Sequence, residues 1–219
     1  MHTNEALLAK LIAERESVTV ESKPVYDAVK RIGDVICASA AICMFSPLLL
    51  GVSAAIMLED PGSPITAQTR VGKDGKEFRI YKFRTTVTDT APAQAALAAV
   101  NERRGTNIQM KCSPRTTRLG ALLRRTAIEG LPQLFNVLKG DMSIIGPRSF
   151  TPQQQAQKPE ERLLVKPGLS CYWQLSDRNA LSKTEQIELD RRYIKERSLW
   201  TDLKLIGRTF RFMLGHNNS

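Results

Sequence analysis

Residues 35–58, VICASAAICMFSPLLLGVSAAIML, form an apolar run that contains no charged side chain. The run is as long as a helix needs to be to cross the hydrocarbon core of a bilayer. It is apolar on every face, whereas a helix on the surface of a soluble core has a polar side. The run therefore predicts a membrane helix, and a buried core helix of a soluble protein is the competing interpretation.

Pro47 lies in the middle of this run, directly after Ser46. Proline removes a backbone donor and crowds the preceding turn, so we expect a bend there, and the serine hydroxyl can satisfy a freed carbonyl. A kinked span and a re-entrant helix both fit such a bend. Because Lys30 and Arg31 precede the run and a basic remainder follows it, the positive-inside tendency favours re-entry, with both flanks on the cytoplasmic side of the inner membrane.

The charge of the chain predicts anionic partners. The 219 residues include 32 Lys and Arg against 22 Asp and Glu, a formal net charge of +10. Phosphate esters, acidic lipid head groups and nucleic acid all fit this charge. The sequence contains no nucleic-acid recognition motif, and the apolar run would be an unusual companion for one, so we exclude nucleic acid as a partner. The length predicts one folded domain with appendages.

The segments on either side of the membrane run give the domain organisation. Residues 1–29 are predicted to be an N-terminal amphipathic extension without a signal peptide, because early charges interrupt any apolar stretch. Residues 30–58 contain the membrane helix, and residues 59–219 are predicted to form a cytoplasmic domain.

A small β-hairpin is predicted after the membrane run. Gly72-Lys73-Asp74-Gly75 is a turn signal between two short β-prone runs near residues 65–70 and 78–83. In the second run, Lys82 and Arg84 alternate with apolar or aromatic side chains. They either project from one face toward an anion or form a plain solvated edge.

Two later segments are predicted to be amphipathic helices. RTTRLGALLRRTA, residues 115–127, sets leucines that can face lipid or core against arginines that can face phosphates. LWTDLKLIGRTFRFML, residues 199–214, suits a helix that lies among lipid head groups, and a helix that packs on the core is the alternative. The predicted fold is therefore α+β and mostly α-helical, with a re-entrant membrane helix, the small β-hairpin and amphipathic interfacial helices.

A series of motifs follows this order along the chain. They are KRIGD (30–34), Ser46-Pro47, YKFRT (81–85), PRTTRLG (114–120), LPQLFNVLKGDMSIIGPR (131–148) and VKPGLSCYWQLSDRN (165–179). Taken together, the chain from about residue 30 to residue 212 resembles the monotopic phosphoglycosyl transferases, the bacterial sugar transferase family that starts exopolysaccharide, capsule and lipid-linked glycan assembly.

The resemblance implies an activity and a set of partners. Such enzymes sit in the cytoplasmic leaflet through a re-entrant helix broken at a Ser-Pro pair. They transfer a sugar 1-phosphate from a nucleoside diphosphate sugar, here expected to be a UDP-sugar, to polyprenyl phosphate. They use Mg²⁺, release the nucleoside monophosphate and pass through a phosphosugar bound to an aspartate. Inner-membrane lipids are expected partners, as are further copies of the chain or other glycan-assembly proteins.

The resemblance and the chemistry together select the candidate site residues. Attack on a diphosphate needs a nucleophile, cationic groups around the phosphates and a metal that neutralises charge. Glu129 occupies the nucleophile position, and Asp141 is a candidate for orienting or metal work, with helix capping as its alternative. The expected phosphate-binding residues are Lys82, Arg84, Arg115 and Arg148.

The chain departs from the family pattern at its catalytic dyad. The family has Asp-Glu directly before Leu-Pro-Gln, where the aspartate resembles the nucleophile and the glutamate the metal ligand. Here the two positions hold Glu129 and Gly130, so the metal ligands are not identified by sequence. Two functions therefore follow: a sugar-phosphate transferase with an altered nucleophile, or a catalytically impaired or inactive relative that binds nucleotide sugar or polyprenyl phosphate and regulates glycan assembly.

Overall fold

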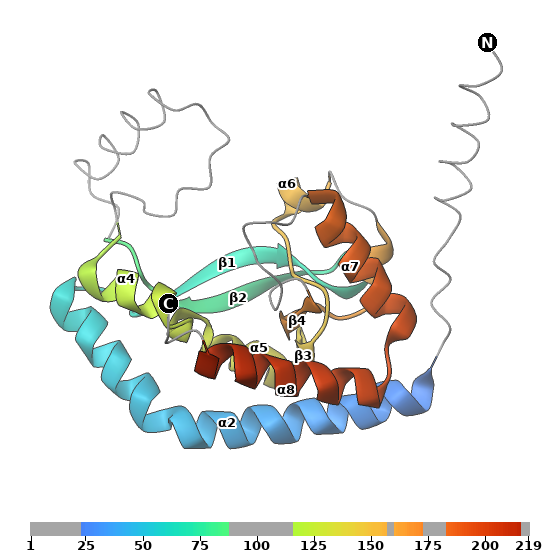
Figure 1. Ribbon diagram of the computed structural model, residues 1–219. Coiled ribbons are helices and arrows are strands. Elements are labelled where there is room, and N and C mark those ends of the chain that lie inside the picture. The colour runs from blue at the N-terminus through green and yellow to red at the C-terminus, as the bar shows by residue number, and fades with distance from the viewer. Residues whose placement is uncertain (1–22, 88–115, 157–159, 173–182, 216–219) are drawn as a thin grey trace, which may run out of the picture. The chain divides into compact units, whose positions relative to one another are not determined.

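The computed structural model describes residues 23–87, 116–156, 160–172 and 183–215 (Figure 1). Helices predominate in this part of the chain, so the predicted α+β, mostly α-helical class is confirmed. The elements are α2 (Pro24–Glu59), β1 (Ile65–Val71), η1 (Lys73–Gly75), β2 (Glu77–Phe83), α4 (Arg118–Arg125), η2 (Ile128–Gly130), α5 (Gln133–Lys139), β3 (Ser143–Ile145), α6 (Pro152–Gln155), η3 (Glu160–Leu164), β4 (Gly168–Ser170), α7 (Lys183–Glu196) and α8 (Leu199–Gly215).

The chain divides into two compact units. Unit 1 comprises the described residues through Ile36, together with Thr69–Phe78 and the residues from Val137 onward. Unit 2 comprises Cys37–Gln68 and Arg79–Asn136. The boundaries fall inside α2, β1, β2 and α5, so these four elements continue from one unit into the other.

Helix α2 contains the predicted Ser-Pro bend. Pro47 has no N–H to donate to the carbonyl of Cys43, four residues earlier. The Ser46 hydroxyl donates to that carbonyl instead, at 2.9 Å, as predicted. Figure 1 shows the ribbon bending near the middle of α2 and continuing as one helix. The interruption is therefore a bend within one helix, and the re-entrant geometry stays a prediction.

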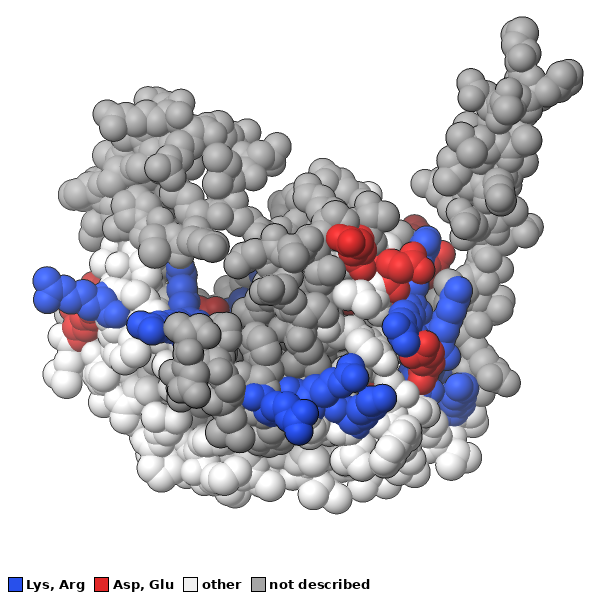
Figure 2. All heavy atoms as spheres, in the orientation of Figure 1, with Lys and Arg blue, Asp and Glu red and all other residues white. Residues whose placement is uncertain are grey.

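The surface of α2 suits lipid rather than a protein core. Among the described helices, α2 is the one that is long and apolar enough to cross a membrane, and only 6% of its most apolar 18-residue window is buried. Met44, Leu50 and Leu58 are all exposed. In Figure 2 the surface over the middle of α2 is white, which marks uncharged residues. The helix already includes residues 24–29, and the predicted boundaries at residues 30 and 58 stay a prediction.

The predicted hairpin is present as β1 and β2, which form a two-stranded sheet. The turn between them is tightened by the Gly72 N–H, which donates to the Lys76 carbonyl at 2.8 Å. Asp74 and Gly75 both adopt positive φ, at 57° and 74°. Glycine adopts this conformation without steric cost and aspartate tolerates it, which explains the turn signal in the sequence.

A second sheet was not predicted. Strand β3 pairs in parallel with β4, with Ser143 opposite Gly168 and Ile145 opposite Ser170. A Cβ added to Gly168 would lie 2.0 Å from the Gly146 backbone nitrogen, and one added to Gly146 would lie 2.5 Å from the Lys166 carbonyl oxygen. The glycines of the IIGPR and VKPGL motifs therefore permit two backbones to approach closely.

Each unit has its own apolar core. In unit 1 the buried side chains are Ile145, Val165, Tyr193, Ile194 and Leu205, which come from β3, the segment before β4, α7 and α8. In unit 2, Ile56, Phe83 and Leu123 join the end of α2, β2 and α4. The leucines of the predicted basic helix therefore differ in their surroundings, because Leu123 is buried while Leu122 is exposed.

Helix α8 combines the two alternatives that its sequence allowed. Leu205 is buried in the core of unit 1 and Ile206 packs against that core. Trp200 and Leu203 are 73% and 60% exposed, beside the exposed Lys204. One side of the helix therefore packs on protein. A neighbouring side presents aromatic, aliphatic and basic groups of the kind that lie among lipid head groups.

The first turns of α2 are tied to unit 1 through Asp202 of α8. Its carboxylate accepts hydrogen bonds from the Tyr26 hydroxyl at 2.8 Å, from Lys30 Nζ at 2.7 Å and from the Tyr193 hydroxyl at 2.9 Å. The Tyr193 hydroxyl also lies 3.1 Å from the Ile145 carbonyl oxygen, so its single proton is shared between the two acceptors. Burial and the adjacent Asp202 carboxylate raise the pKa of Tyr193 well above its ordinary value, so this phenol remains a donor.

The other two charged residues of KRIGD complete this anchor. Arg31 donates to the carbonyls of Val137 and Leu138 at 2.6 and 2.7 Å, in the last turn of α5. Asp34 Oδ1 accepts from the Ile144 N–H of β3 at 3.0 Å. The motif therefore joins α2 to α5, β3 and α8 within unit 1.

We expect Gly168→Ala to lower the free energy of unfolding by about 2 kcal/mol or more, because the added methyl would overlap backbone atoms that cannot rotate away. Gly207→Ala is the matched control. A Cβ there meets nothing within 4 Å in α8, and alanine favours a helix over glycine by about 1 kcal/mol. Thermal unfolding in detergent measures both changes. Equal stability of the two variants would contradict the close approach at β4.

Candidate functional site

The candidate nucleophile Glu129 lies in unit 2, on the short turn η2 that follows α4. Ala127 brings the chain out of α4 with φ of 58°, in the left-handed region that a residue with a Cβ rarely adopts. Such a conformation costs about 1–2 kcal/mol and is retained where the surrounding structure requires it, often at functional sites. This strained position two residues before Glu129 supports the choice of η2 as a site.

Arg124 of α4 connects Glu129 to two other motifs. Its Nε lies 3.6 Å from Glu129 Oε2 and donates to Thr85 Oγ1 at 3.0 Å, while its Nη1 donates to Thr116 Oγ1 at 3.3 Å. Thr85 ends YKFRT and Thr116 belongs to PRTTRLG. The side chains of Arg124 and Glu129 are about a third exposed, at 35% and 32%, so both are accessible from solvent. One guanidinium therefore brings two motifs together beside the Glu129 carboxylate.

Backbone contacts hold the same motifs together. The Thr117 N–H donates to the Thr85 carbonyl at 3.2 Å, and the Thr117 hydroxyl caps α4 by accepting from the Gly120 N–H at 2.9 Å. A Cβ on Gly120 would lie 2.2 Å from the Thr85 carbonyl oxygen. The glycine in PRTTRLG is therefore required for the start of α4 to rest against the end of β2.

Asn136 attaches α5 to the same strand within unit 2. This fully buried side chain accepts from the Tyr81 N–H at 3.0 Å and donates to the Arg79 carbonyl at 2.7 Å. Its amide thus satisfies backbone groups of β2 as a neighbouring strand would. The asparagine of LPQLFNVLKG has a structural task that sequence analysis did not assign.

Arg84, a predicted phosphate-binding residue, makes its contacts inside unit 2. Its guanidinium pairs with the Asp60 carboxylate at 3.2 Å and donates to the Asp60 and Pro61 carbonyls, and only 8% of the side chain is exposed. It also lies against Gly62, which has φ of 132°. Arg84 therefore stabilises the turn that leads from α2 to β1, and its contact with phosphate stays a prediction.

The structure places the remaining predicted residues in different parts of the chain. Lys82 is partly buried on β2 in unit 2, whereas Asp141 and Arg148 lie in unit 1, each partly buried in a loop beside β3. Asp141 follows Gly140, which leaves α5 with φ of 93°. Arg115 is outside the described residues. The roles predicted for these residues stay predictions.

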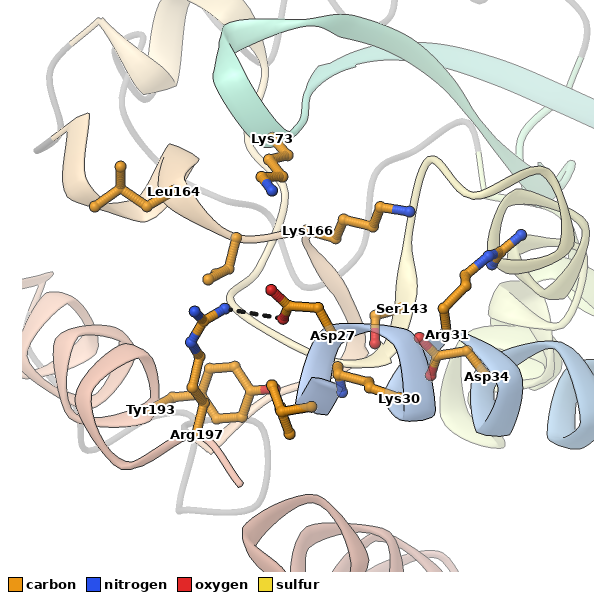
Figure 3. A pocket seen from close by; sticks show the side chains of 12 residues that line it. Asp27, Lys30, Arg31, Asp34, Lys73, Ser143, Leu164, Lys166, Tyr193 and Arg197 are labelled. Atoms are coloured by element: carbon orange, nitrogen blue, oxygen red, sulfur yellow. Dashed lines mark hydrogen bonds and ion pairs between the residues drawn. The ribbon is translucent and has the colours of Figure 1, made fainter. Parts of the chain in front are cut away.

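A pocket of about 160 Å³ lies in unit 1 between the first turns of α2, the hairpin turn, the segment before β4 and α7 (Figure 3). It contains several charged groups, but Lys30 pairs with Asp202, and Arg197 pairs with Asp27 at 3.2 Å. Lys166 also lines it, and burial together with the nearby Arg31 and Lys73 charges lowers the pKa of this lysine. Because its main ion pairs anchor α2, we assign this pocket to the fold rather than to the reaction.

No group of three or more His, Cys, Asp or Glu side chains that could hold a metal ion occurs among the described residues. Glu129 is therefore considered as a single carboxylate ligand. Magnesium in proteins is usually bound through one or two carboxylates, with substrate phosphates and waters completing its octahedral shell. One glutamate fits the lower end of this pattern.

Most of the chain matches a known protein family. Residues 25–216 match the model of the family described as bacterial sugar transferase. The chain belongs to the bacterial sugar transferase family. The motifs in the sequence identified this family, and the match covers the whole range from about residue 30 to residue 212 over which the resemblance was recognised.

Three relatives show the range of this family. The UDP-N-acetylgalactosamine-undecaprenyl-phosphate N-acetylgalactosaminephosphotransferase of Aeromonas hydrophila is 38% identical over 200 residues, which are 87% of this chain and 45% of that protein. The UDP-glucose:undecaprenyl-phosphate glucose-1-phosphate transferase of Caulobacter vibrioides is 38% identical over 206 residues, 88% of this chain and 72% of that protein. The exopolysaccharide production protein ExoY of Rhizobium meliloti is 32% identical over 195 residues, 85% of this chain and 86% of that protein.

The chain spans less than half the length of several bacterial sugar transferases that it matches. It covers 42% of an uncharacterized sugar transferase of Haemophilus influenzae and 39% of the galactosyl transferase CpsE of Streptococcus agalactiae.

We expect Gly130→Glu to fold normally, because a Cβ at this position meets only the end of the flexible Gln133 side chain, at 3.2 Å, and the glycine does not have positive φ. Its midpoint of thermal unfolding should change by less than about 2 °C. Gly120→Ala is the contrasting variant, since its methyl would overlap the Thr85 carbonyl, and should unfold at a clearly lower temperature. A large loss for Gly130→Glu would show that the site cannot accept the family's second carboxylate.

Proposed function

We propose that this chain transfers a sugar 1-phosphate from a nucleoside diphosphate sugar to polyprenyl phosphate, the step that initiates exopolysaccharide or lipid-linked glycan synthesis. The observation that carries the proposal is Glu129, held beside Arg124 where the YKFRT and PRTTRLG motifs meet. Membership of the bacterial sugar transferase family supports it, as do relatives named as undecaprenyl-phosphate sugar phosphotransferases.

The proposed reaction has two steps. In the first, a Glu129 carboxylate oxygen attacks the phosphorus that carries the sugar. A new phosphorus–oxygen bond forms, the bond to the bridging oxygen breaks, and the nucleoside monophosphate leaves with the electron pair. In the second, a phosphate oxygen of polyprenyl phosphate attacks the same phosphorus and the Glu129 carboxylate leaves. Arg124 lies close enough to Glu129 to stabilise negative charge on the phosphoryl oxygens.

Mg²⁺ is proposed as the cofactor, and when bound it would neutralise charge on the diphosphate oxygens. Glu129 is the residue of this site that can reach such an ion, with substrate phosphate and water as the other ligands. Gly130 leaves space beside it, since among the described residues only Gln133 lies within 4 Å of a Cβ built there. A single carboxylate therefore has to serve where the family pattern has two.

The donor is proposed to be a UDP-sugar, because the relatives are named for UDP-sugars. Their names include N-acetylgalactosamine and glucose at similar identity to this chain, so the sugar itself is not assigned. The acceptor is proposed to be undecaprenyl phosphate or a similar polyprenyl phosphate.

We further propose that α2 enters the cytoplasmic leaflet of the inner membrane and returns to the same face at the Ser46-Pro47 bend. The hydrogen bond from Ser46 to the Cys43 carbonyl supports this, because it satisfies the carbonyl that Pro47 leaves without a donor inside an apolar run. The exposed apolar side chains of α2 and the Trp200 side of α8 suit contact with lipids.

Purified protein in nanodiscs should release uridine monophosphate from a UDP-sugar when polyprenyl phosphate and Mg²⁺ are supplied. Glu129→Gln should lower this rate by about a thousandfold or more, because an amide is a poor nucleophile and leaves no covalent route. A panel of UDP-sugars identifies the donor. Unchanged release from Glu129→Gln would exclude Glu129 as the nucleophile.

The native dyad itself should limit the rate. The extra methylene of Glu129 displaces its oxygens by about 1 Å relative to aspartate, which costs about a hundredfold in rate. The double change Glu129→Asp with Gly130→Glu should therefore release monophosphate faster than the native chain. Binding of UDP-sugar without turnover in the native chain, together with activity in the double variant, would identify the native protein as a binding relative that regulates glycan assembly.

Re-entry of α2 predicts that residue 10 lies on the cytoplasmic side. A Lys10→Cys variant made in a chain without other cysteines should resist a membrane-impermeant thiol reagent in intact cells and react after the cells are opened. Reaction in intact cells would show that α2 crosses the membrane and would exclude re-entry.

A further inference from the structure

Four consecutive carbonyls fix the loop that carries Arg148. The Pro147 carbonyl accepts from the Gly168 N–H at 2.9 Å, and the Phe150 carbonyl accepts from the Val71 N–H at 2.9 Å. Between them, the Arg148 carbonyl accepts from Arg162 Nη2 at 3.0 Å and the Ser149 carbonyl accepts from Arg70 Nη1 at 3.3 Å. The donors come from β1, η3 and β4, all in unit 1. The backbone from which the Arg148 side chain extends therefore has little freedom.

Arg162 of η3 contacts the loop from a buried position and has other partners as well. It is only 4% exposed, and its guanidinium pairs with the buried carboxylate of Asp190 on α7. It also lies over the Phe150 ring, 4.2 Å from the ring centroid. A planar guanidinium can stack on a ring and donate in two directions at once, which a lysine ammonium cannot do. Arg162 therefore holds both ends of the Arg148-Ser149-Phe150 segment.

The charges in this region favour an anion beside the loop. Burial lowers the pKa of Arg162, and the nearby Arg148 charge lowers it further, while Asp190 opposes both effects. Burial and Arg148 likewise lower the pKa of Arg70. The Arg148 charge therefore acts on both Arg70 and Arg162. Like charges close together are unfavourable, so a bound phosphate would stabilise the cluster.

We propose that Arg162 is a positioning residue that acts through the Arg148 carbonyl to fix the Arg148 side chain for binding the diphosphate of the donor. This inference rests on the proposed function, because it takes Arg148 as a phosphate-binding residue. Arg162 itself does not touch the substrate. Its two contacts on the loop fix the backbone position from which the Arg148 side chain extends.

The test measures UDP binding by calorimetry in nanodiscs, which does not depend on turnover. Arg162→Lys keeps a cation for Asp190 but loses the geometry that reaches the Arg148 carbonyl. It should weaken UDP binding about tenfold, the size expected for loss of one charge-assisted hydrogen bond. In an Arg148→Ala background, the same change should weaken binding by less than about twofold, since the side chain that Arg162 positions is absent.

Arg191→Lys is the matched control. Arg191 pairs with Glu161 at 2.7 Å and so also joins α7 to η3, but its two hydrogen bonds go to Glu161 and not to the loop. It should leave UDP binding unchanged. If Arg162→Lys fails to fold, Asp190→Asn tests the same step. It removes the charge that holds Arg162, and should weaken UDP binding about threefold in the native background and not in Arg148→Ala.

Equal weakening by Arg162→Lys with and without Arg148 would overturn the proposal, because Arg162 would then act by general stability alone. Native UDP affinity in Arg148→Ala would also overturn the positioning role. It would not bear on the transferase function, which the monophosphate-release assay tests separately. Absence of UDP binding by the native chain would contradict both the positioning role and the proposed donor.

Discussion

The arrangement of unit 1 depends on the hydrogen bonds that the buried Asp202 carboxylate accepts. This carboxylate receives two tyrosine hydroxyls and a lysine ammonium, from α2 and α7, while it sits on α8. A buried carboxylate is costly unless each oxygen has donors, and here both oxygens do. Arg31 and Asp34 extend the same attachment to the end of α5 and to β3. Polar side chains in the first turns of α2 thereby join this largely apolar helix to the rest of unit 1.

The local features of the fold were predictable because a few adjacent residues determine them. The Gly72–Gly75 turn and the Ser46-Pro47 bend follow from backbone conformations that glycine and proline impose. The β3–β4 pair was not predictable, because three-residue strands carry too little alternation to be recognised. Their pairing depends on a close backbone approach between Gly146 and Gly168, which are far apart in sequence.

The candidate site, like the fold, was predictable only in part. The motif that contains Glu129 was identified by its neighbours in sequence, and the structure places this carboxylate on a partly exposed turn beside an arginine. Arg124 was predicted as one of several arginines of the basic helix that can face phosphates, and its hydrogen bonds to Thr85 and Thr116 were not predicted. For Arg84, charge and motif position suggested a phosphate ligand, whereas the structure shows the contacts of a turn-stabilising side chain. A sequence does not reveal which cations have internal partners.

The long separation between α2 and its anchor bears on the order of events during synthesis. Lys30 and Asp202 are 172 residues apart. At the usual rates of translation, the ribosome needs on the order of ten seconds to make that intervening chain. The apolar run of α2 is complete long before α8 exists, so the proposed entry of α2 into the bilayer requires no residue of α8. On the proposed topology, α2 is therefore available to the membrane before the residues that hold its start have been made.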